Sequence, residues 1–349
     1  MDKKRASGRY YTRGNPFQLK PFQTWAKALN LKQQAALEPF AGAKDIPQLL
    51  DAAHLQCREW AFFDIEPGAK GIVQRDTLAD FPKGFNVCIT NPPWLARNSA
   101  TRRGLPFPQA TRYDDLYKYA LEQCLTHCDW VAAIIPEAFI RSGLFLQRLH
   151  DFISLVPQKQ ASYPSDKENN TSSYPPDKVG KGGSVMFEDT EHPVGLALFA
   201  PDATPDVRIW RNNQFLGGLD KLRTHLPQPS SNRSIVFNNP NGNLGLIAID
   251  NTVSASIRFC PPEELKDYPI RVHCRSITKI GVPWEVDIDR LNTRLGTIRD
   301  KTHDVFLTAF KGLRRDGHYR RRLDSKLTRA IVDVDGLQYM MLPKSKQTT

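Results

Sequence analysis

Residues 87–98, VCITNPPWLARN, place an amide side chain, two prolines and a tryptophan directly after an apolar run. Each proline fixes its own φ angle, so the surrounding carbonyls and the Asn91 side chain are held with little freedom. The Asn91 amide oxygen and the Pro92 carbonyl, left without a neighbouring N–H because Pro93 has none, are two acceptors. Together they could hold both hydrogens of an exocyclic amine and make its nitrogen nucleophilic. Trp94 offers a flat face on which the base carrying that amine could stack.

A proline-terminated edge strand would account for Pro92 and Pro93 but not for Asn91 and Trp94 beside them. Three other strand-like runs also end in residues that suit a nucleoside. The first is followed by the small residues Ala41, Gly42 and Ala43, and the others end in Asp64 and Asp76.

In open α/β sheets, ligands bind at the carboxyl ends of strands. There, Asp64 could accept hydrogen bonds from ribose hydroxyls, with Glu66 as the next carboxylate on the same face, and Asp76 could accept from an adenine amine. Taken singly, each carboxylate is more typical of a helix cap or a solvated loop. At three successive strand ends they predict a nucleoside pocket.

The elements that must position these residues follow an alternating pattern, which predicts an α/β fold with a doubly wound, mainly parallel sheet and a reversed terminal strand. Strands are predicted at residues 35–40, 60–65, 71–76, 85–90 and 130–136, with two more at 184–189 and 194–201 that could pair antiparallel. Helical patterns cover residues 45–54, 113–125 and 144–153.

After about residue 205 the sequence changes to short strand-like runs, prolines and clusters of charge. This change predicts two domains, 1–205 and 206–349, of which the second is a mixed α+β domain. Residues 157–183 are rich in Ser, Pro, Lys, Asn and Gly, which predicts a mobile loop. The stretch 311–329 carries eight Lys or Arg against two Asp.

The chain of 349 residues has a net charge of +11 and a pI near 9.4, which favours a polyanionic partner. It lacks an apolar run of membrane-spanning length and an apolar stretch behind its N-terminus, so the sequence predicts a cytoplasmic protein without a membrane partner. The six cysteines lack paired metal-ligand spacings, so we expect no metal site, and Cys124 and Cys128 are predicted to pack in the core.

The tetrapeptide NPPW resembles the (D/N/S)PP(Y/F/W) motif of amino-methyltransferases, which use S-adenosylmethionine to modify exocyclic amines. EPFAGA is similar to their methionine-binding motif, FFDIEP to their ribose-binding acid and QRDTL to their adenine-binding acid. RYYTRGNPFQLKPFQTWA resembles the N-terminal motif that covers the methionine end. The motif order, over residues 9 to about 200, resembles the gamma group of DNA adenine-N6 methyltransferases of restriction–modification systems. Lys44 departs from the second glycine of many members, and Trp94 from the commoner tyrosine.

This resemblance implies a Rossmann-like class I methyltransferase sheet, S-adenosylmethionine as cofactor, and double-stranded DNA as substrate, with the target adenine flipped out of the duplex. It also implies a C-terminal target-recognition domain and a cognate restriction endonuclease as a functional partner. The catalytic residues would be Asn91, Pro92, Pro93 and Trp94. The cofactor-binding residues would be Tyr11, Thr12, Glu38, Pro39, Phe40, Ala41, Gly42, Asp64, Ile65, Asp76 and Asn91. Residues expected at DNA phosphates are Arg97, Arg102, Arg103, Arg314, Arg315, Arg320, Arg321 and Arg322.

Two other functions fit parts of the same sequence. The amine could belong to an RNA base or to a glutamine side chain of a protein, although a long basic C-terminal half without a recognisable RNA-binding module favours DNA. A nucleic-acid-binding protein that keeps the fold without activity would not require Asp64, Asp76, Asn91 and Trp94 together. The sequence contains no convincing metal-binding acid cluster beside a catalytic lysine, so we do not expect a restriction nuclease in the same chain.

Overall fold

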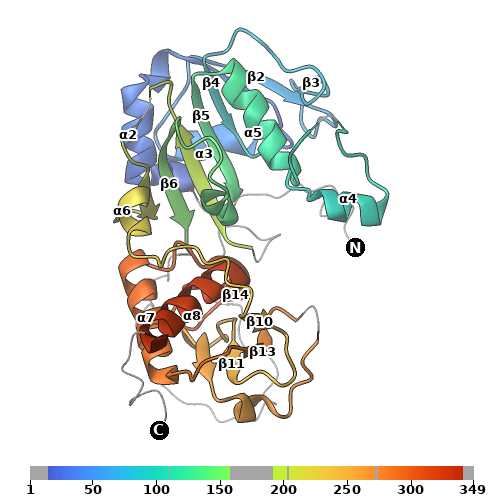
Figure 1. Cartoon of the computed structure of the whole chain (residues 1–349). Helices are drawn as coiled ribbons and strands as arrows, with labels where there is room; N and C mark the ends of the chain where they lie inside the picture. Colours follow the sequence, from blue (N-terminus) through green and yellow to red (C-terminus); the bar gives the residue numbers. More distant parts are fainter. Residues whose placement is uncertain (1–14, 110, 158–191, 203, 272–273, 341–349) are drawn as a thin grey trace, which may run out of the picture. The chain divides into compact units, whose positions relative to one another are not determined.

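The computed structural model of the protein describes residues 15–109, 111–157, 192–202, 204–271 and 274–340, which form two compact units (Figure 1). The first unit contains residues 15–135 with 155–157, and the second contains residues 136–154 and 192–340. The loop predicted at residues 157–183 and the strand predicted at 184–189 lie, apart from Pro157, outside the described residues.

The first unit alternates short strands with helices, as the sequence predicts. Its elements are η1 (Pro16–Gln18), α2 (Lys20–Ala28), η2 (Leu31–Gln33), β1 (Ala35–Glu38), α3 (Asp45–Ala52), β2 (Glu59–Asp64), β3 (Val73–Gln74), β4 (Val87–Thr90), α4 (Arg97–Arg103), α5 (Leu116–His127) and β5 (Trp130–Pro136).

The second unit begins with a 3-10 helix and four strands and continues into smaller sheets and two long helices. Its elements are η3 (Glu137–Ser142), β6 (Leu149–Leu155), β7 (Val194–Phe199), β8 (Arg208–Arg211), β9 (Gln214–Gly218), α6 (Leu219–Arg223), β10 (Val236–Phe237), β11 (Leu244–Ile247), β12 (Arg258–Cys260), η4 (Pro262–Leu265), β13 (Ile277–Gly281), α7 (Ile288–Thr302), β14 (Thr308–Leu313), β15 (Tyr319–Arg322) and α8 (Ser325–Met340).

The main strands have the order β3-β2-β1-β4-β5 in the first unit and β7-β6-β8-β9 in the second. Parallel ladders join β2 to β3, β1 to both β2 and β4, β4 to β5, and β6 to β8. The β8–β9 pair is antiparallel. This mainly parallel sheet flanked by helices confirms the predicted α/β class.

Continuous apolar strands form the centre of the first unit. All four residues of β4 and five of the seven in β5 are buried, as in parallel strands covered on both faces. Trp25 of α2 contacts Trp130 at the start of β5, with ring centroids 5.9 Å apart. The Sγ atoms of Cys88 in β4 and Cys124 in α5 lie 3.7 Å apart. Cys124 and Cys128 are both buried, which confirms the predicted core packing.

One predicted element is wrong. Residues 144–153 were expected to form a helix because their leucines recur at helical spacing, but residues 149–155 form strand β6. Six of the seven β6 residues are buried. A short buried apolar run cannot be assigned by periodicity alone. The buried Asp151 inside it is satisfied by the Arg208 guanidinium at 2.8 and 2.7 Å and by Trp210 Nε1 at 2.7 Å.

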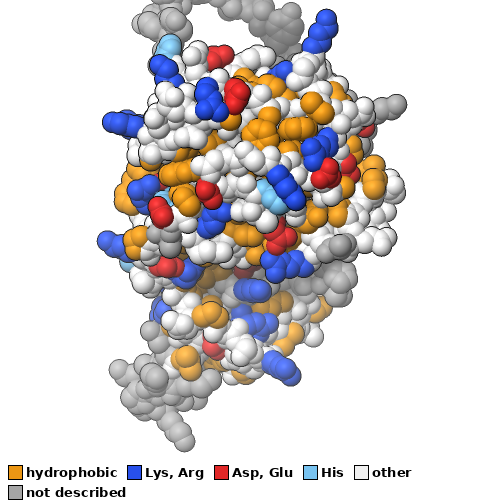
Figure 2. All heavy atoms as spheres, turned by 90° about the horizontal axis from the view of Figure 1, so that it is seen from above, with side chains coloured by type: hydrophobic (Ala, Val, Ile, Leu, Met, Phe, Trp, Pro, Cys, Tyr) orange, Lys and Arg blue, Asp and Glu red, His pale blue; other side chains and the backbone are white. Residues whose placement is uncertain are grey.

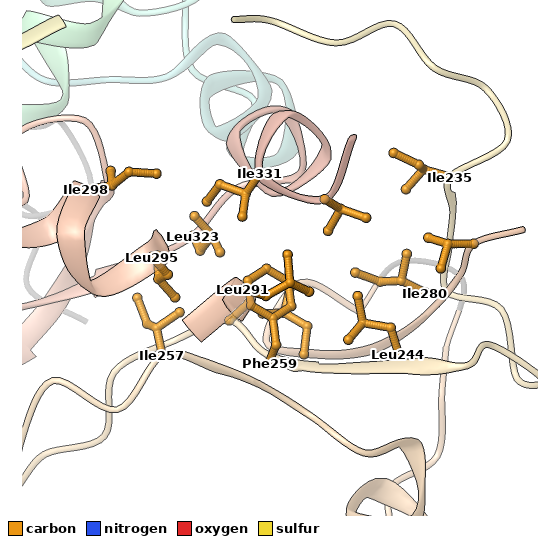
Figure 3. Close-up of a cluster of buried hydrophobic side chains, with 14 of the residues drawn as sticks. Ile235, Leu244, Ile257, Phe259, Ile280, Leu291, Leu295, Ile298, Leu323 and Ile331 are labelled. Atoms are coloured by element: carbon orange, nitrogen blue, oxygen red, sulfur yellow. The ribbon is translucent and has the colours of Figure 1, made fainter. Parts of the chain in front are cut away.

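The C-terminal part of the second unit is the expected mixed α+β module. Its four-stranded sheet has the order β10-β13-β11-β12 with antiparallel pairing, and β14 and β15 form a separate hairpin. Figure 3 shows residues of α7 and α8, among them Leu291, Leu295 and Ile331, gathered with Leu244 and Ile280 of the sheet in one apolar cluster.

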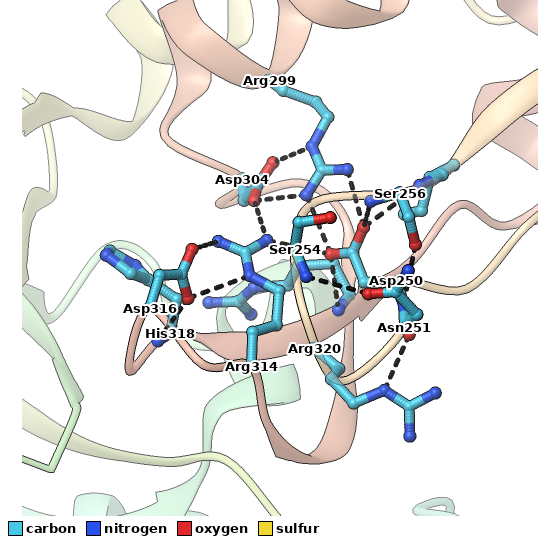
Figure 4. A network of polar contacts seen from close by, with 12 residues as sticks. Asp250, Asn251, Ser254, Ser256, Arg299, Asp304, Arg314, Asp316, His318 and Arg320 are labelled. Carbon is cyan, nitrogen blue, oxygen red and sulfur yellow. Dashed lines mark hydrogen bonds and ion pairs between the residues drawn. The ribbon is translucent and has the colours of Figure 1, made fainter.

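A buried ion network lies beside that cluster (Figure 4). Both oxygens of the fully buried Asp250 accept from Arg299, each at 2.9 Å, and Arg314 Nη1 adds a contact at 3.1 Å. Arg299 also donates to Asp304 at 2.8 Å, and Arg314 to Asp316 at 2.8 Å. Burial alone would raise the pKa of Asp250, but the hydrogen bonds and charge of Arg299 outweigh it and lower that pKa below its usual range.

The division of the chain differs from the boundary predicted near residue 205, because polar contacts tie η3 to the C-terminal hairpin. Glu137 is buried and accepts from Arg321 Nη2 at 3.0 Å and from Ser154 Oγ at 2.8 Å. Arg141 donates to Asp324 and to Thr308 Oγ1. These interactions are within the second unit and group residues 136–154 with the C-terminal strands.

Removing the carboxylate at the centre of the network should destabilise the fold. Asp250→Ala leaves Arg299 and Arg314 buried without their shared partner, which should cost about 3–5 kcal/mol of unfolding free energy, measured by urea denaturation. Because the folded pKa is lowered, this contribution is present above about pH 4 and is lost as pH falls through the folded pKa. Asp220→Ala, which breaks an exposed pair with Arg223, is the control and should cost less than about 1 kcal/mol. Equal losses would contradict this account.

Candidate active site

The order of strands brings the predicted site residues together at one edge of the sheet. β1 pairs with β2 through Glu38 and Phe62 and with β4 through Leu37 and Cys88. Because these ladders are parallel, Glu38 at the end of β1 has the ends of β2 and β4 on either side. Asp64 is the last residue of β2, and Asn91 follows β4 directly.

The loop after β1 is held by the end of β2. Ala41 N donates to the Phe63 carbonyl at 2.9 Å, and Gly42 N donates to Asp64 Oδ2 at 2.9 Å. Asp64 Oδ1 accepts from Glu66 N at 2.8 Å. Both oxygens of Asp64 therefore accept from the backbone, and this carboxylate links the loop after β1 to the end of β2.

Gly42 and Lys44 in this loop have φ values of +50° and +63°, in the left-handed region. Glycine adopts that conformation without strain, but lysine does so only where contacts compensate. The Lys44 ammonium donates to the Lys70 carbonyl at 2.7 Å and lies 4.3 Å from the centroid of the Phe62 ring. These contacts explain how a lysine is tolerated at this turn.

Glu38 is the most isolated carboxyl group of the site. It is 2% exposed, and its Oε2 atom has no hydrogen-bond partner among the described residues. Burial raises the pKa of Glu38 well above its usual value, and the charges of Asp45 and Asp64 raise it further, while Lys44 lowers it. A buried acceptor of this kind is free to bind a donor group of a ligand.

The third acid is arranged differently. Asp76 is exposed, two residues after β3, and its Oδ1 accepts from the backbone N–H of Leu78 and Ala79 at 3.1 and 3.2 Å. It therefore caps a local turn, one of the roles that the sequence left open. The next residue, Thr77, is buried and donates to the Pro39 carbonyl at 2.9 Å, which ties this turn to the β1 loop. Sequence reasoning did not single out Thr77.

The tetrapeptide 91–94 is followed by a segment that is firmly held. Arg97 N donates to the Asp114 carbonyl at 2.8 Å, and Leu116 N donates to the Leu95 carbonyl at 2.9 Å. Ala96 and Asp115 form an antiparallel bridge between these two bonds. Residues 95–97 thus pair with residues 114–116 at the start of α5, and this pairing fixes the direction in which the chain leaves the tetrapeptide.

Arg97, expected at DNA phosphates, has a structural role. Its Nη2 donates to the carbonyls of Thr111 and Tyr113 at 2.7 and 2.9 Å, and its guanidinium lies 4.5 Å from the Phe107 ring centroid. A guanidinium committed to two carbonyls is not presented to a phosphate. By contrast, Arg102 and Arg103 are exposed in the last turn of α4.

Asp115 was not singled out from the sequence, because an acid at the start of an amphipathic helix has the ordinary appearance of a cap. Its Oδ1 is buried without a hydrogen-bond partner among the described residues. Burial raises the pKa of Asp115 to about 6. A titratable carboxyl group therefore lies next to the segment that follows the tetrapeptide.

Two of the C-terminal arginines expected at DNA are also in the interior. Arg314 and Arg321 are buried and form ion pairs with Asp250 and Glu137 respectively. Their charges compensate carboxylates inside the second unit, which corrects the expectation of a phosphate contact.

The other three C-terminal arginines differ among themselves. Arg320 is half-buried, donates to the Asp250 carbonyl at 2.7 Å and lies 5.0 Å from the Phe310 ring centroid. Arg315 is exposed and Arg322 is half-buried. Tyr11 and Thr12, expected at the cofactor, lie outside the described residues.

Within the described ranges there is no group of three or more His, Cys, Asp and Glu residues that could hold a metal ion. A search for membrane spans over the same residues found no helix of sufficient length and apolarity.

Neither a protein-family model nor a curated protein matches the chain. Among solved structures, it is similar to a protein described as a modification subunit of a type I restriction enzyme from Vibrio vulnificus (13% identity, 58% of this chain and 47% of that one, TM-score 0.34). A protein of Listeria monocytogenes described as a class I S-adenosylmethionine-dependent methyltransferase matches with 13% identity over 58% of this chain and 68% of that one, at a TM-score of 0.34. A protein of Thermoplasma acidophilum matches with 10% identity over 53% of this chain and 94% of that one, at a TM-score of 0.29. Scores this low carry no argument about function.

The raised pKa of Asp115 gives a pH-dependent prediction. The pKa of an aspartate in the unfolded chain is about 3.9, which is below the folded value of about 6 for Asp115. The protein is therefore destabilised as pH rises from about 4 to about 6, because the unfolded state ionises at a lower pH than the folded state. Asp115→Asn, which keeps the shape of the side chain but removes its ionisable group, should therefore stabilise the protein by about 2–3 kcal/mol at pH 8. The gain should shrink as pH falls from 6 towards 4, as measured by urea unfolding across that range. A gain independent of pH would rule out a buried ionisable Asp115.

Proposed function

We propose that the protein is an S-adenosylmethionine-dependent DNA methyltransferase that modifies the N6 amine of adenine within a specific duplex sequence. One observation carries this proposal: NPPW follows the end of β4, directly beside the end of β1, where the small-residue loop and the buried Glu38 lie. An amine-holding tetrapeptide and a nucleoside-binding loop on adjacent strand ends are the two halves of an amine methylation site. A restriction–modification system, with a cognate endonuclease as functional partner, is the setting in which such a modification protects DNA.

The residues around Glu38 fit the cofactor. The unsatisfied Oε2 atom of Glu38 suits the ammonium group at the methionine end, and residues 39–42 allow close backbone approach. Asp64, at the end of β2, would accept from the ribose hydroxyls, and Asp76 would accept from the adenine amine. Ile65, 54% exposed directly after Asp64, offers an apolar surface to a planar ring. When bound, the cofactor supplies an electrophilic methyl group.

The tetrapeptide would act on the target base. The Asn91 amide oxygen and the Pro92 carbonyl accept the two hydrogens of the amine, which directs its lone pair towards the methyl group. Trp94 stacks on the flipped base and offsets part of the unstacking cost, which is a few kcal/mol. The amine would form the new N–C bond as the sulfonium carbon–sulfur bond of the cofactor breaks, and it would release one proton to solvent. The Asn91 amide oxygen and the Pro92 carbonyl would stabilise the positive charge that develops on the amine nitrogen.

Double-stranded DNA is the proposed substrate because the chain carries a net charge of +11. Figure 2 shows a face on which Lys and Arg alternate with Asp, Glu and apolar side chains, so the excess is not concentrated there. Arg102, Arg103, Arg315 and Arg322 remain proposed phosphate contacts, while the C-terminal module would read the target sequence.

Methylation of an RNA base or of a protein glutamine would use the same amine-holding device. Purified protein with radiolabelled S-adenosylmethionine and a panel of duplex DNA, RNA and protein substrates separates these functions. Sequencing DNA from an expressing host by a method that detects N6-methyladenine then identifies the base and the site together. Label transferred only to RNA or protein would overturn the DNA assignment, and no transfer in a folded protein that binds the cofactor would favour a binding protein.

Cofactor binding should depend on Asp64. Asp64→Ala removes the acceptor for the ribose hydroxyls and for Gly42 N, and should weaken S-adenosylmethionine binding by about 1–3 kcal/mol in calorimetry. Asp80→Ala, at an exposed carboxylate paired with Arg75, is the matched control and should bind normally. Unchanged affinity in a folded Asp64 variant would remove this residue from the site.

Chemistry should depend on Asn91. Asn91→Ala removes one of the two acceptors that position the amine and should lower single-turnover methylation by roughly 100-fold or more, because single preorganised polar contacts are worth about that much. Duplex affinity should persist, since phosphate contacts supply most of it.

Trp94 provides the companion control for the Asn91 variant. Trp94→Phe should keep stacking and flipping, whereas Trp94→Ala should lose the fluorescence signal of 2-aminopurine placed at the target. Wild-type methylation by the Asn91 variant would contradict the amine-holding account of the tetrapeptide.

A further inference from the structure

Three arginines of the second unit come from separate segments to one place. Arg322 in β15 pairs with Thr308 of β14 and forms a bridge with Ile249. The guanidinium of Arg141 in η3 donates to the hydroxyl of the same Thr308.

Backbone contacts bring in the third arginine, Arg275. Ala248 accepts from Leu323 N at 2.8 Å and donates to the Ser276 carbonyl at 2.7 Å. Leu323, which follows Arg322, and Ser276, which follows Arg275, are therefore both hydrogen-bonded to Ala248.

The cluster has more positive than negative charge. Asp324 accepts from Arg141. Neither Arg275 nor Arg322 forms an ion pair among the described residues. Burial lowers the pKa of Arg322, and the charges of Arg275 and Arg141 lower it further, with only Asp324 acting in the opposite direction. Three guanidinium groups thus share one carboxylate.

The less exposed arginines of this unit are arranged differently. Arg299, Arg314 and Arg321 each form an ion pair with a buried carboxylate, at 2.9, 3.1 and 3.0 Å. By comparison, Arg141 and Arg275 are exposed, Arg322 is half-buried, and their cluster keeps an excess of positive charge. Like charges held close together repel one another, and a bound anion relieves that repulsion.

We propose that Arg141, Arg275 and Arg322 form a phosphate-binding site whose ligand is the backbone of duplex DNA. The inference rests on the proposed function, which it deepens by naming a site of contact. Planar guanidinium groups match phosphate oxygens in bidentate geometry, and a polymer of phosphates suits a chain with a net charge of +11. Of the run 320–322, only Arg322 belongs to this site.

The test uses the full-length chain without added cofactor. Arg275→Gln, Arg322→Gln and the double variant are compared with Arg258→Gln, which removes an arginine already neutralised by Glu264 at 2.7 Å. Arg141 is left intact because its ion pair with Asp324 belongs to the fold. Fluorescence anisotropy with a labelled duplex across a salt series gives affinity and salt dependence. Circular dichroism and S-adenosylmethionine binding verify that the variants fold.

Each single variant should weaken duplex binding roughly tenfold at 0.1 M salt and reduce the slope of log K against log salt by about one, and the double variant by about two. The Arg258 variant should keep the wild-type slope. A double variant with the wild-type slope, or an equal loss at Arg258, would overturn the site. So would a loss confined to duplex RNA.

Failure of the proposed function has a different signature. A wild-type protein that binds S-adenosylmethionine but no duplex would overturn the DNA assignment and this site with it. A wild-type protein that binds and methylates DNA, with unchanged binding by the variants, would overturn only the site.

Discussion

The parallel pairing of β1 with β2 on one side and β4 on the other determines where Glu38, Asp64 and Asn91 lie. Parallel neighbours end at the same edge of a sheet, so Glu38, Asp64 and Asn91 meet although 53 positions separate the first from the last. The pairing depends on burial, because β4 is fully buried and its backbone polar groups must be satisfied within the sheet. Asp64 reinforces the arrangement by accepting from Gly42 N, which makes the shape of the β1 loop depend on the end of β2.

The strands and the site edge could be predicted from the sequence because each strand is a continuous apolar run that ends in a polar or small residue. Strand β5 coincides with the predicted residues 130–136, and β2 differs from its prediction by one residue at each end. Strand β6 could not be separated from a helix, because leucines at positions 146 and 149 and Ile153 also fit helical spacing, and the neighbouring strand that buries them is distant in sequence. Whether such a segment forms a strand or a helix depends on its pairing with distant strands. The local sequence carries no signal of that pairing.

Charge was the least reliable guide to position. The sequence predicts that the run 320–322 contacts DNA phosphates, yet Arg321 is buried against Glu137, 184 residues earlier in the chain. A local count cannot anticipate a partner at that distance. Arg97 shows the same limitation within a shorter segment, because its partners are the carbonyls of Thr111 and Tyr113, and a carbonyl leaves no signal in the amino-acid sequence. Arginine density therefore indicates that anions are needed nearby, and the structure decides whether they are carboxylates of the protein or phosphates of a ligand.

Buried polar groups without a hydrogen-bond partner indicate where a ligand, and not the protein, would compensate a charge. Glu137 and Asp335 each have one buried oxygen without a partner among the described residues, but the other oxygen of each is ion-paired to an arginine, so the group as a whole is compensated. Glu38 forms no such ion pair with the part of the chain that the structure describes, and its burial at a strand end disfavours the charged form. Leaving a buried carboxyl group in that state costs free energy that a purely structural role would not require, since an apolar side chain could fill the same volume. A ligand that donates to this oxygen would offset the cost, which supports the proposed place of Glu38 in the cofactor site.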